Sequence, residues 1–328
     1  MIHEIKVCPG TLKEGHSTYS SICRKRMFFN KKVDHILPYD SPSQSEEANE
    51  QFIENKKRIS ISGVQEKQSL TLQRNKLRLT KDGEQGKYIL KPIPRDLRLV
   101  NQVPANEHLT MQIASQIYGI NTAANALIFF QTGEPAYLTK RFDVKDDDTK
   151  WGTEDFGSLS NRTKESHGES YKYENISYED IAELIAKYVG AYQVEIEKFY
   201  KLILFNYLFS NGDAHLKNFS LLETISGDYI LSPAYDLLNT RIHVADTFFA
   251  LKTGLFKDGS VRNPTSKDFK VFGKTIGIKD SRLAKIYDMF LSFKPEVEAM
   301  IQKSFLNKKA KKGYLIHYNT RFNVLEKS

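Results

Sequence analysis

The chain has 328 residues, of which 40% are hydrophobic and 27% charged, as in ordinary globular proteins that are long enough for two domains. No apolar run approaches the roughly 18 residues that would cross a membrane, and the N-terminus lacks a signal-peptide pattern, so we expect a cytoplasmic protein. The net charge of +8 allows contact with nucleic acid, an acidic partner or nucleotide phosphates, although a lysine-rich solvated surface explains it equally well.

The first 57 residues form a polar, basic extension without recognisable catalytic chemistry. Residues 24–29 have the pattern of a short helix, and residues 44–55 that of an exposed helix or connector. Cys8 and Cys23 supply metal-ligand types together with His16, but their spacing matches no common zinc motif. Reduced, structural cysteines are therefore the favoured interpretation.

A serine- and glycine-bearing segment at residues 58–67 precedes a predicted hairpin, whose strands cover residues 69–72 and 77–79. Backbone N–H groups of such a loop can bind phosphates, as they do in glycine-rich loops. The alternative is a plain hairpin, and with a single glycine the segment alone does not decide between the two.

The apolar strand at residues 88–92 carries one lysine, Lys91, which is costly to bury unless it is paired. In kinases a strand lysine binds nucleotide phosphates and pairs with a helix glutamate. Glu107, at the start of a helical pattern that reaches Ile117, is the candidate partner. In the alternative, Lys91 reaches solvent and Glu107 is a solvated first-turn acid; the preceding loop favours the pair.

Two further strands, at residues 126–130 and 136–143, complete a small, mainly β N-terminal lobe. We expect the end of the second strand to form a hinge that hydrogen-bonds adenine through its backbone, near Lys140, Arg141 and Phe142.

The remainder of the chain is mostly helical. Residues 154–169 are polar and are expected to face the substrate as a loop, and a capping box predicts a helix that starts after Ser177. Residues 199–209 form an apolar, helix-like run. The basic run at residues 303–312 is most simply a solvated helix face.

The most informative pattern follows that apolar run and surrounds a predicted hairpin, with strands at residues 219–222 and 229–231. Asp213, Asn218 and Asp236 have the spacing of the catalytic and magnesium-binding residues of kinase-like phosphotransferases. One carboxylate orients the attacking hydroxyl, while an amide oxygen and the second carboxylate hold the Mg²⁺ that bridges the phosphates. Magnesium keeps several waters, so two protein ligands are enough.

Six of these stretches together resemble the HipA-type serine/threonine kinases of bacterial toxin–antitoxin systems, especially the short HipT-like forms. They follow the family's order from about residue 58 to about residue 240, and they are SISGVQEK (60–67), ILK (89–91), NE (106–107), KRFD (140–143), GDAHLKNF (212–219) and SPAYD (232–236). The resemblance implies an α+β, bilobal protein-kinase-like fold. We expect an N-terminal extension (1–57), a small mainly β N-lobe (58–143) and a larger helical C-lobe (144–328).

The resemblance also implies ATP and Mg²⁺ as cofactors and a role for each matching residue. Asp213 would be the catalytic base, Lys91 would bind the phosphates, and Glu107 would position Lys91. Asn218 and Asp236 would hold Mg²⁺, and Lys217 would stabilise the charge of the transferring phosphate. The other expected nucleotide-binding residues are Ile61, Ser62, Gly63, Val64, Gln65 and Glu66 of the phosphate loop, and Lys140, Arg141, Phe142, His215 and Tyr235.

Ser60 aligns with the family's autophosphorylated loop serine, and Ser62 with a second phosphosite of the short forms. A phosphate there would add negative charge where the phosphates of ATP must lie, so autophosphorylation is expected to inactivate the enzyme.

The resemblance implies a protein substrate, with aminoacyl-tRNA synthetases as the class by analogy. It also implies a DNA-binding antitoxin as partner, so that contact with nucleic acid is only indirect, and no contact with a membrane. The 57 residues before the phosphate loop are too few for the additional N-terminal β subdomain of full-length HipA proteins. In the short-form systems that subdomain is a separate small protein, which is a second candidate partner.

Two other hypotheses stay open. A small-molecule kinase of the aminoglycoside or choline type shares the spacing of Asp213 and Asn218, although the serine-bearing phosphate loop disfavours it. A catalytically silent partner of a DNA-bound antitoxin suits the basic charge, but the intact set of Lys91, Asp213, Asn218 and Asp236 argues against it.

Overall fold

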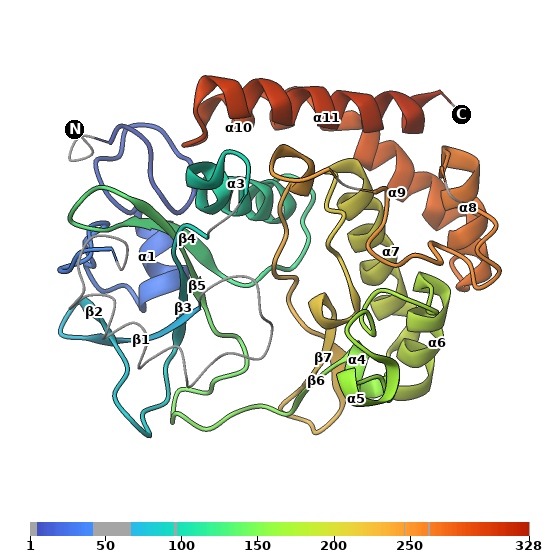
Figure 1. The fold of residues 1–328 in the computed structure, drawn as a ribbon, viewed down its shortest axis with the longest axis horizontal. Coiled ribbons are helices and arrows are strands. Elements are labelled where there is room, and N and C mark those ends of the chain that lie inside the picture. Colours follow the sequence, from blue (N-terminus) through green and yellow to red (C-terminus); the bar gives the residue numbers. More distant parts are fainter. Residues whose placement is uncertain (1–4, 42–66, 95–96, 246, 262, 328) are drawn as a thin grey trace. The chain divides into compact units, whose positions relative to one another are not determined.

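The computed structural model describes residues 5–41, 67–94, 97–245, 247–261 and 263–327 (Figure 1). The chain separates into two compact units. Unit 1 comprises Met1–Gln112, Ala123–Thr149 and Ala299–Lys311, and unit 2 comprises Ile113–Thr122, Lys150–Glu298 and Lys312–Ser328. The predicted phosphate loop lies outside the described residues, and the predicted domain boundaries stay predictions.

Unit 1 is built on a five-stranded antiparallel sheet with the strand order β2-β1-β3-β5-β4 (Figure 1). Each of the five predicted strands is present, with ends that shift by up to three residues. The strands are β1 (Gln68–Gln73), β2 (Lys76–Leu79), β3 (Tyr88–Lys91), β4 (Asn125–Phe129) and β5 (Pro135–Lys140). The strand with the predicted phosphate-binding lysine, β3, is therefore central.

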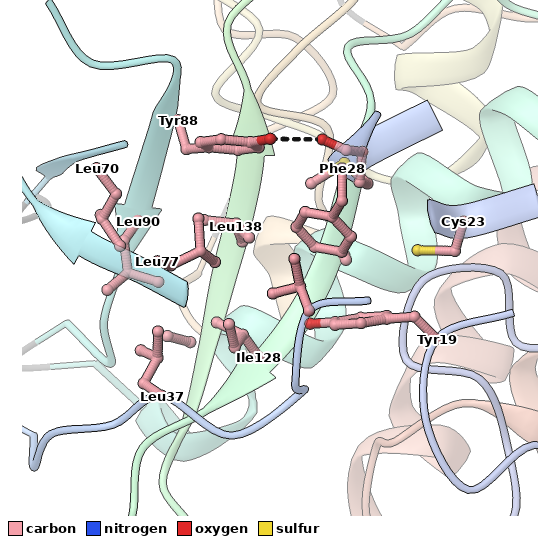
Figure 2. Packing of buried hydrophobic residues seen from close by; sticks show 14 of the residues in the cluster. Tyr19, Cys23, Phe28, Leu37, Leu70, Leu77, Tyr88, Leu90, Ile128 and Leu138 are labelled. Atoms are coloured by element: carbon pink, nitrogen blue, oxygen red, sulfur yellow. Dashed lines mark hydrogen bonds between the residues drawn. The ribbon is translucent and has the colours of Figure 1, made fainter. Parts of the chain in front are cut away.

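Successive side chains of a strand point to opposite faces of a sheet. The side chains on one face of this sheet pack against the N-terminal extension. Tyr88 and Leu90 of β3 lie in a buried cluster with Phe28 of helix α1 (Ser21–Phe28), and the Tyr88 hydroxyl donates a hydrogen bond to the Met27 carbonyl at 2.7 Å (Figure 2). The extension contributes Cys8, Tyr19, Cys23, Met27, Phe28, Val33 and Leu37 to this cluster. The segment that reads as polar and irregular thus supplies much of the core.

Lys91 belongs to the opposite face of β3, since it follows Leu90 by one residue. Helix α3 (Val103–Gln116) follows the short 3₁₀ helix Val100–Gln102 and supplies Glu107. The helix begins four residues before the predicted start. Pro104 is compatible with this, because the first turn of a helix does not need the missing N–H.

Unit 2 is mainly helical, with a small antiparallel sheet of strand order β6-β7-β8. Its strands are β6 (Thr153–Asp155), β7 (Ser220–Glu223) and β8 (Tyr229–Leu231), and its helices include α4 (Phe156–Leu159), α5 (Lys164–His167), α6 (Tyr178–Tyr188), α7 (Tyr192–Leu208), α8 (Ser266–Thr275) and α9 (Asp280–Ser292). Two C-terminal helices, α10 (Lys294–Lys303) and α11 (Lys308–Glu326), contain residues of both units. The α+β class is confirmed.

Two local predictions in unit 2 have different outcomes. The capping box is confirmed, because the Ser177 side chain accepts from the Asp180 N–H and Asp180 accepts from the Ser177 N–H at the start of α6. The expected loop at residues 154–169 instead contains β6 residues and the short helices α4 and α5. Asp155 and Thr163 cap these helices with their side chains, a local signal that the overall polarity of the segment hides.

No helix in the described parts of the chain has the length and apolar character that crossing a membrane requires.

The Tyr88 hydroxyl bond predicts a measurable loss of stability. Tyr88→Phe keeps the ring but removes the donor for the Met27 carbonyl, so we expect the free energy of unfolding to fall by about 1 kcal/mol. Urea denaturation measures this change. The matched control is Tyr188→Phe, whose side chain is 40% exposed. Equal stabilities of the two variants would contradict the importance of the Tyr88 bond.

Candidate active site

The loop between α7 and β7 is anchored at its start by hydrogen bonds of main-chain and side-chain groups. Ser210 has a left-handed backbone with φ 54°, which turns the chain away from the helix axis. The Asn211 N–H donates to the Asn206 carbonyl at 2.8 Å, and its side-chain amide donates to the Asn206 side chain at 2.9 Å. The Thr240 hydroxyl accepts from the Gly212 N–H and donates to the Ser210 carbonyl, both at 2.9 Å. The residue that follows this turn is Asp213.

Asp213 is exposed. Its carbonyl accepts from the His215 N–H at 2.8 Å, which tightens the loop. Its carboxylate oxygen Oδ1 accepts a hydrogen bond from the Tyr173 hydroxyl at 2.9 Å. A general base must lie within about 2.6–3.2 Å of the hydroxyl whose proton it takes. The structure therefore shows this carboxylate in contact with a hydroxyl group at that distance.

Asn218 and Asp236 are in contact. Asn218 closes the 3₁₀ helix Leu216–Asn218, and its Nδ2 lies 3.4 Å from Asp236 Oδ2. Its Oδ1 accepts from the His215 N–H at 3.1 Å. Asp236 has φ 56°, a left-handed conformation that Asp tolerates better than most residues with a side chain. The two predicted metal ligands are thus brought together from opposite ends of the β7–β8 hairpin.

The chemical types of these two side chains suit a magnesium ion. Carboxylate and amide oxygens are hard ligands, and Mg²⁺ keeps several waters, so two protein ligands suffice. The Asn218 amide presents its nitrogen to Asp236, so a shared cation requires this amide to rotate until the oxygen faces the carboxylate. Among the described residues, no group of three His, Cys, Asp or Glu side chains forms a metal site of another kind.

His215 lies in the buried part of the catalytic loop, with 6% of its surface exposed. Burial, reinforced by the positive charge of Lys172, lowers the pKa of its imidazole to about 3. The ring is therefore neutral at physiological pH. Its Nδ1 is buried.

Lys217 and Tyr235 directly precede the two predicted metal ligands, Asn218 and Asp236, in the sequence. The Lys217 ammonium lies 3.7 Å from Asp155 Oδ2, at the junction of β6 and α4. The Tyr235 hydroxyl donates to the Lys217 carbonyl at 3.0 Å. Lys217 thus has a carboxylate partner, from which it would have to turn in order to stabilise a transferring phosphate.

In unit 1, Lys91 and Glu107 form the ion pair that the sequence suggested. Lys91 Nζ lies 2.6 Å from Glu107 Oε1, and the two side chains are only 4% and 2% exposed. The ammonium also lies 5.3 Å from the centre of the Tyr137 ring, its cross-strand neighbour. The alternative in which Lys91 reaches solvent is therefore wrong.

The predicted hinge follows the end of β5. The Lys140 N–H donates to the Ala124 carbonyl and the Arg141 N–H to the Lys87 carbonyl, both at 2.8 Å. These two N–H groups are thus satisfied within unit 1, and adenine contacts here would have to use carbonyl groups or Phe142. The adenine-binding role of this segment stays a prediction.

Sequence reasoning missed Tyr173, Thr240 and Asp155. Tyr173 lies 40 residues before Asp213 in a polar stretch, and Thr240 lies 28 residues after Gly212. No local pattern links residues at such separations. A weak signal existed for Asp155, since an Asp before a short apolar stretch is a common helix cap.

Because the ion pair is buried, we expect removal of one partner to destabilise the protein more than removal of both. Glu107→Leu leaves the Lys91 ammonium buried without its carboxylate, and we expect a loss of about 3–5 kcal/mol in the free energy of unfolding. The double variant Lys91→Met/Glu107→Leu removes both charges and should recover most of that loss. Denaturant titration measures both values. A double variant that is as unstable as the single one would show that the pair itself stabilises the fold.

The buried histidines predict acid sensitivity. Burial lowers the pKa of His215 to about 3 and that of His108 to about 4, from an ordinary value of 6.5. Between these pKa values the unfolded chain binds protons at histidines that stay neutral in the folded chain. The free energy of unfolding is therefore unaffected by these histidines above pH 6.5 and falls as the pH drops toward 4.

A His108→Gln variant should reduce the slope of this dependence by up to about 1.4 kcal/mol per pH unit. Urea titrations between pH 7 and pH 4.5 measure the slope. His167→Gln, which alters an exposed histidine, is the control. If the free energy of unfolding depends equally steeply on pH in the two variants, His108 is not the source of the acid sensitivity.

Comparisons with known proteins agree with the resemblance seen in the sequence. A protein of Haemophilus influenzae with the name "Putative kinase" is 27% identical over 268 residues, which make up 76% of each chain. A protein of Sinorhizobium fredii with the name "Putative kinase Y4dM" is 29% identical over 215 residues, which make up 61% of this chain and 50% of the relative.

Two solved structures share the fold. The HipA chain in a complex of HipA, HipB and operator DNA from Shewanella oneidensis matches with a TM-score of 0.62 and 20% identity, over 82% of this chain and 64% of that chain. The Helicobacter pylori proinflammatory kinase CtkA matches with a TM-score of 0.51 and 16% identity, over 78% of this chain and 90% of that chain. At these identities the likeness shows the fold alone.

A family model described as "HipA-like C-terminal domain" matches residues 59–299. This range includes all the predicted catalytic and metal-binding residues. It also covers well over half of the chain, and the protein therefore belongs to the family of HipA-like C-terminal domains.

Proposed function

We propose that this chain is an ATP- and Mg²⁺-dependent serine/threonine protein kinase that acts as the toxin of a bacterial toxin–antitoxin system. The observation that carries the proposal is the catalytic loop. An anchored turn presents the exposed Asp213 carboxylate, and the same loop holds Asn218 in contact with Asp236. Membership of the HipA-like family supports this interpretation.

Each residue has a distinct part in the proposed reaction. The Asp213 carboxylate orients the acceptor hydroxyl and accepts its proton as the new bond to phosphorus forms. Glu107 holds the Lys91 ammonium, which binds the phosphates of the nucleotide. Lys217 turns from Asp155 toward the transferring group. Asn218 and Asp236 would hold Mg²⁺, which neutralises phosphate charge when it is bound.

We further propose a bilobal, kinase-like arrangement in which residues 61–66 form the phosphate loop, residues 140–142 the hinge, and Tyr235 and His215 line the nucleotide site. Ser60 and Ser62 are the proposed autophosphorylation sites. Phosphate on either serine would repel the phosphates of ATP and so inactivate the enzyme.

The proposed partner is a DNA-binding antitoxin, since the Shewanella relative was solved together with HipB and operator DNA. A separate small protein equivalent to the N-terminal β subdomain of full-length HipA proteins is a second proposed partner. The proposed substrate is a cytoplasmic protein of the translation machinery, such as an aminoacyl-tRNA synthetase. An exposed catalytic carboxylate suits a protein substrate better than a small molecule that must be enclosed.

The decisive experiment locates phosphate after incubation with magnesium and ATP. We expect mass spectrometry to find phosphate on Ser60 or Ser62 of the wild type and none on Asp213→Asn, because that variant loses the base but keeps the shape of the side chain. ATP affinity of the phosphorylated protein should be clearly lower than that of the unmodified protein.

Three results would contradict parts of this proposal. Phosphate that appears equally in Asp213→Asn would exclude Asp213 as the base. Equal ATP affinity of the two phosphorylation states would exclude inactivation by the loop phosphate. Absence of both ATP binding and phosphate transfer would favour a silent partner of the antitoxin.

A further inference from the structure

Tyr173 makes a contact that the proposed reaction does not use. Its hydroxyl donates a hydrogen bond to Asp213 Oδ1 at 2.9 Å. In the proposed reaction this carboxylate receives the proton of the acceptor hydroxyl, which must approach within about 2.6–3.2 Å. A hydroxyl of the chain itself therefore lies where the hydroxyl of a substrate is needed.

The backbone around Tyr173 is fixed to unit 2 on one side by Lys252. The Lys252 N–H donates to the Tyr173 carbonyl at 2.9 Å, and the Lys252 ammonium forms an ion pair with Glu174. A second attachment is the Leu216 N–H, which donates to the Lys172 carbonyl at 3.3 Å. This attachment ties the segment directly to the catalytic loop.

Arg162 secures the other end of the segment. Its guanidinium donates to the Glu174 carbonyl at 2.9 Å and to the Asn175 carbonyl at 2.6 Å. Asn175 has φ 54°, a left-handed turn after which α6 begins. With its main chain attached at these points, Tyr173 can leave Asp213 by rotation of its side chain alone.

The ring of Tyr173 is supported but not enclosed. It meets the His215 ring edge to face, with a centroid distance of 5.1 Å, and the Lys172 ammonium lies 5.0 Å from its centre. The side chain is only partly buried. Contacts of this kind favour one position of the ring and still allow another, since edge-to-face pairs and exposed cation–π contacts are each worth only about 1 kcal/mol.

We propose that Tyr173 occupies the acceptor-hydroxyl position at Asp213 and competes with the substrate hydroxyl, so that a substrate must displace it before phosphate transfer. This proposal deepens the proposed function and rests on it, because it assumes that Asp213 is the base. It predicts a restraint on activity that is built into unit 2 and needs no antitoxin.

A different role for the same bond would be to orient the Asp213 carboxylate for catalysis. The two roles have opposite kinetic signatures. Removal of a competitor lowers KM for the acceptor and leaves kcat unchanged. Removal of a positioning residue lowers kcat, because the carboxylate is then poorly aligned in the transition state.

The test compares Tyr173→Phe with the wild type. The substitution keeps the ring against His215 and removes only the hydroxyl. The acceptor probe is a synthetic peptide of residues 55–66, NKKRISISGVQE, which contains Ser60 and Ser62. We expect KM for this peptide to fall by about 10-fold, the lower end of what a hydrogen bond to a charged acceptor is worth, with kcat and KM for ATP unchanged.

The matched control is Tyr171→Phe, two residues earlier on the same segment. The Tyr171 ring lies near Gly157, and its hydroxyl makes no hydrogen bond within the described part of the chain. This variant should have wild-type kinetics. A lower kcat with unchanged KM in Tyr173→Phe would make Tyr173 a positioning residue and overturn the proposal. Unchanged kinetics, or phosphate on Tyr173 itself, would also overturn it.

A binding measurement separates failure of this inference from failure of the proposed function. Fluorescence anisotropy of the labelled peptide, with a non-hydrolysable ATP analogue present, requires no turnover. Tighter binding to Tyr173→Phe supports the competition even if the peptide is a poor substrate. Equal binding overturns the competition while Asp213-dependent autophosphorylation still stands. If that autophosphorylation is absent as well, the proposed function fails with it.

Discussion

The geometry of the proposed catalytic loop depends on the hydrogen bonds of the Thr240 hydroxyl. This hydroxyl accepts from the Gly212 N–H and donates to the Ser210 carbonyl, and the Thr240 N–H donates to that same carbonyl at 3.1 Å. Thr240 itself follows Asp236 by four residues. One side chain therefore ties the turn before the proposed base to the segment after the proposed metal ligand.

Burial divides the proposed machinery into two kinds of residue. Lys91 and Glu107 are almost completely buried, and each provides the charge that the other needs in a medium of low dielectric. Asp213 is exposed and accepts a hydrogen bond from Tyr173, a residue that is itself only partly buried. The proposed phosphate-binding pair is thus enclosed, whereas the proposed base, which would have to meet a variable substrate, is accessible.

Local patterns predicted much of the fold but not its long-range contacts. The strands of unit 1 and the start of α6 were predictable because alternation and capping are properties of a few neighbouring residues. The proximity of Asn218 and Asp236 followed from a hairpin between them. Tyr173 and Thr240 were not predictable, since their partners are distant in sequence and their surroundings are polar. The packing of Tyr19 and Phe28 on the sheet was missed because these residues lie in a segment without periodic hydrophobicity.

The N-terminal extension has a consequence for the synthesis of the protein. The Tyr19 hydroxyl donates to the Leu127 carbonyl at 2.7 Å across 108 residues, and the Leu37 N–H donates to the Phe129 carbonyl at 2.7 Å. Tyr19 and Leu37 therefore find these partners only after β4 has been synthesised. Contacts this distant in sequence form slowly. The sheet of unit 1 therefore stays incomplete until β5 has been made, and until then the apolar side chains of residues 5–41 that pack on it are accessible to chaperones.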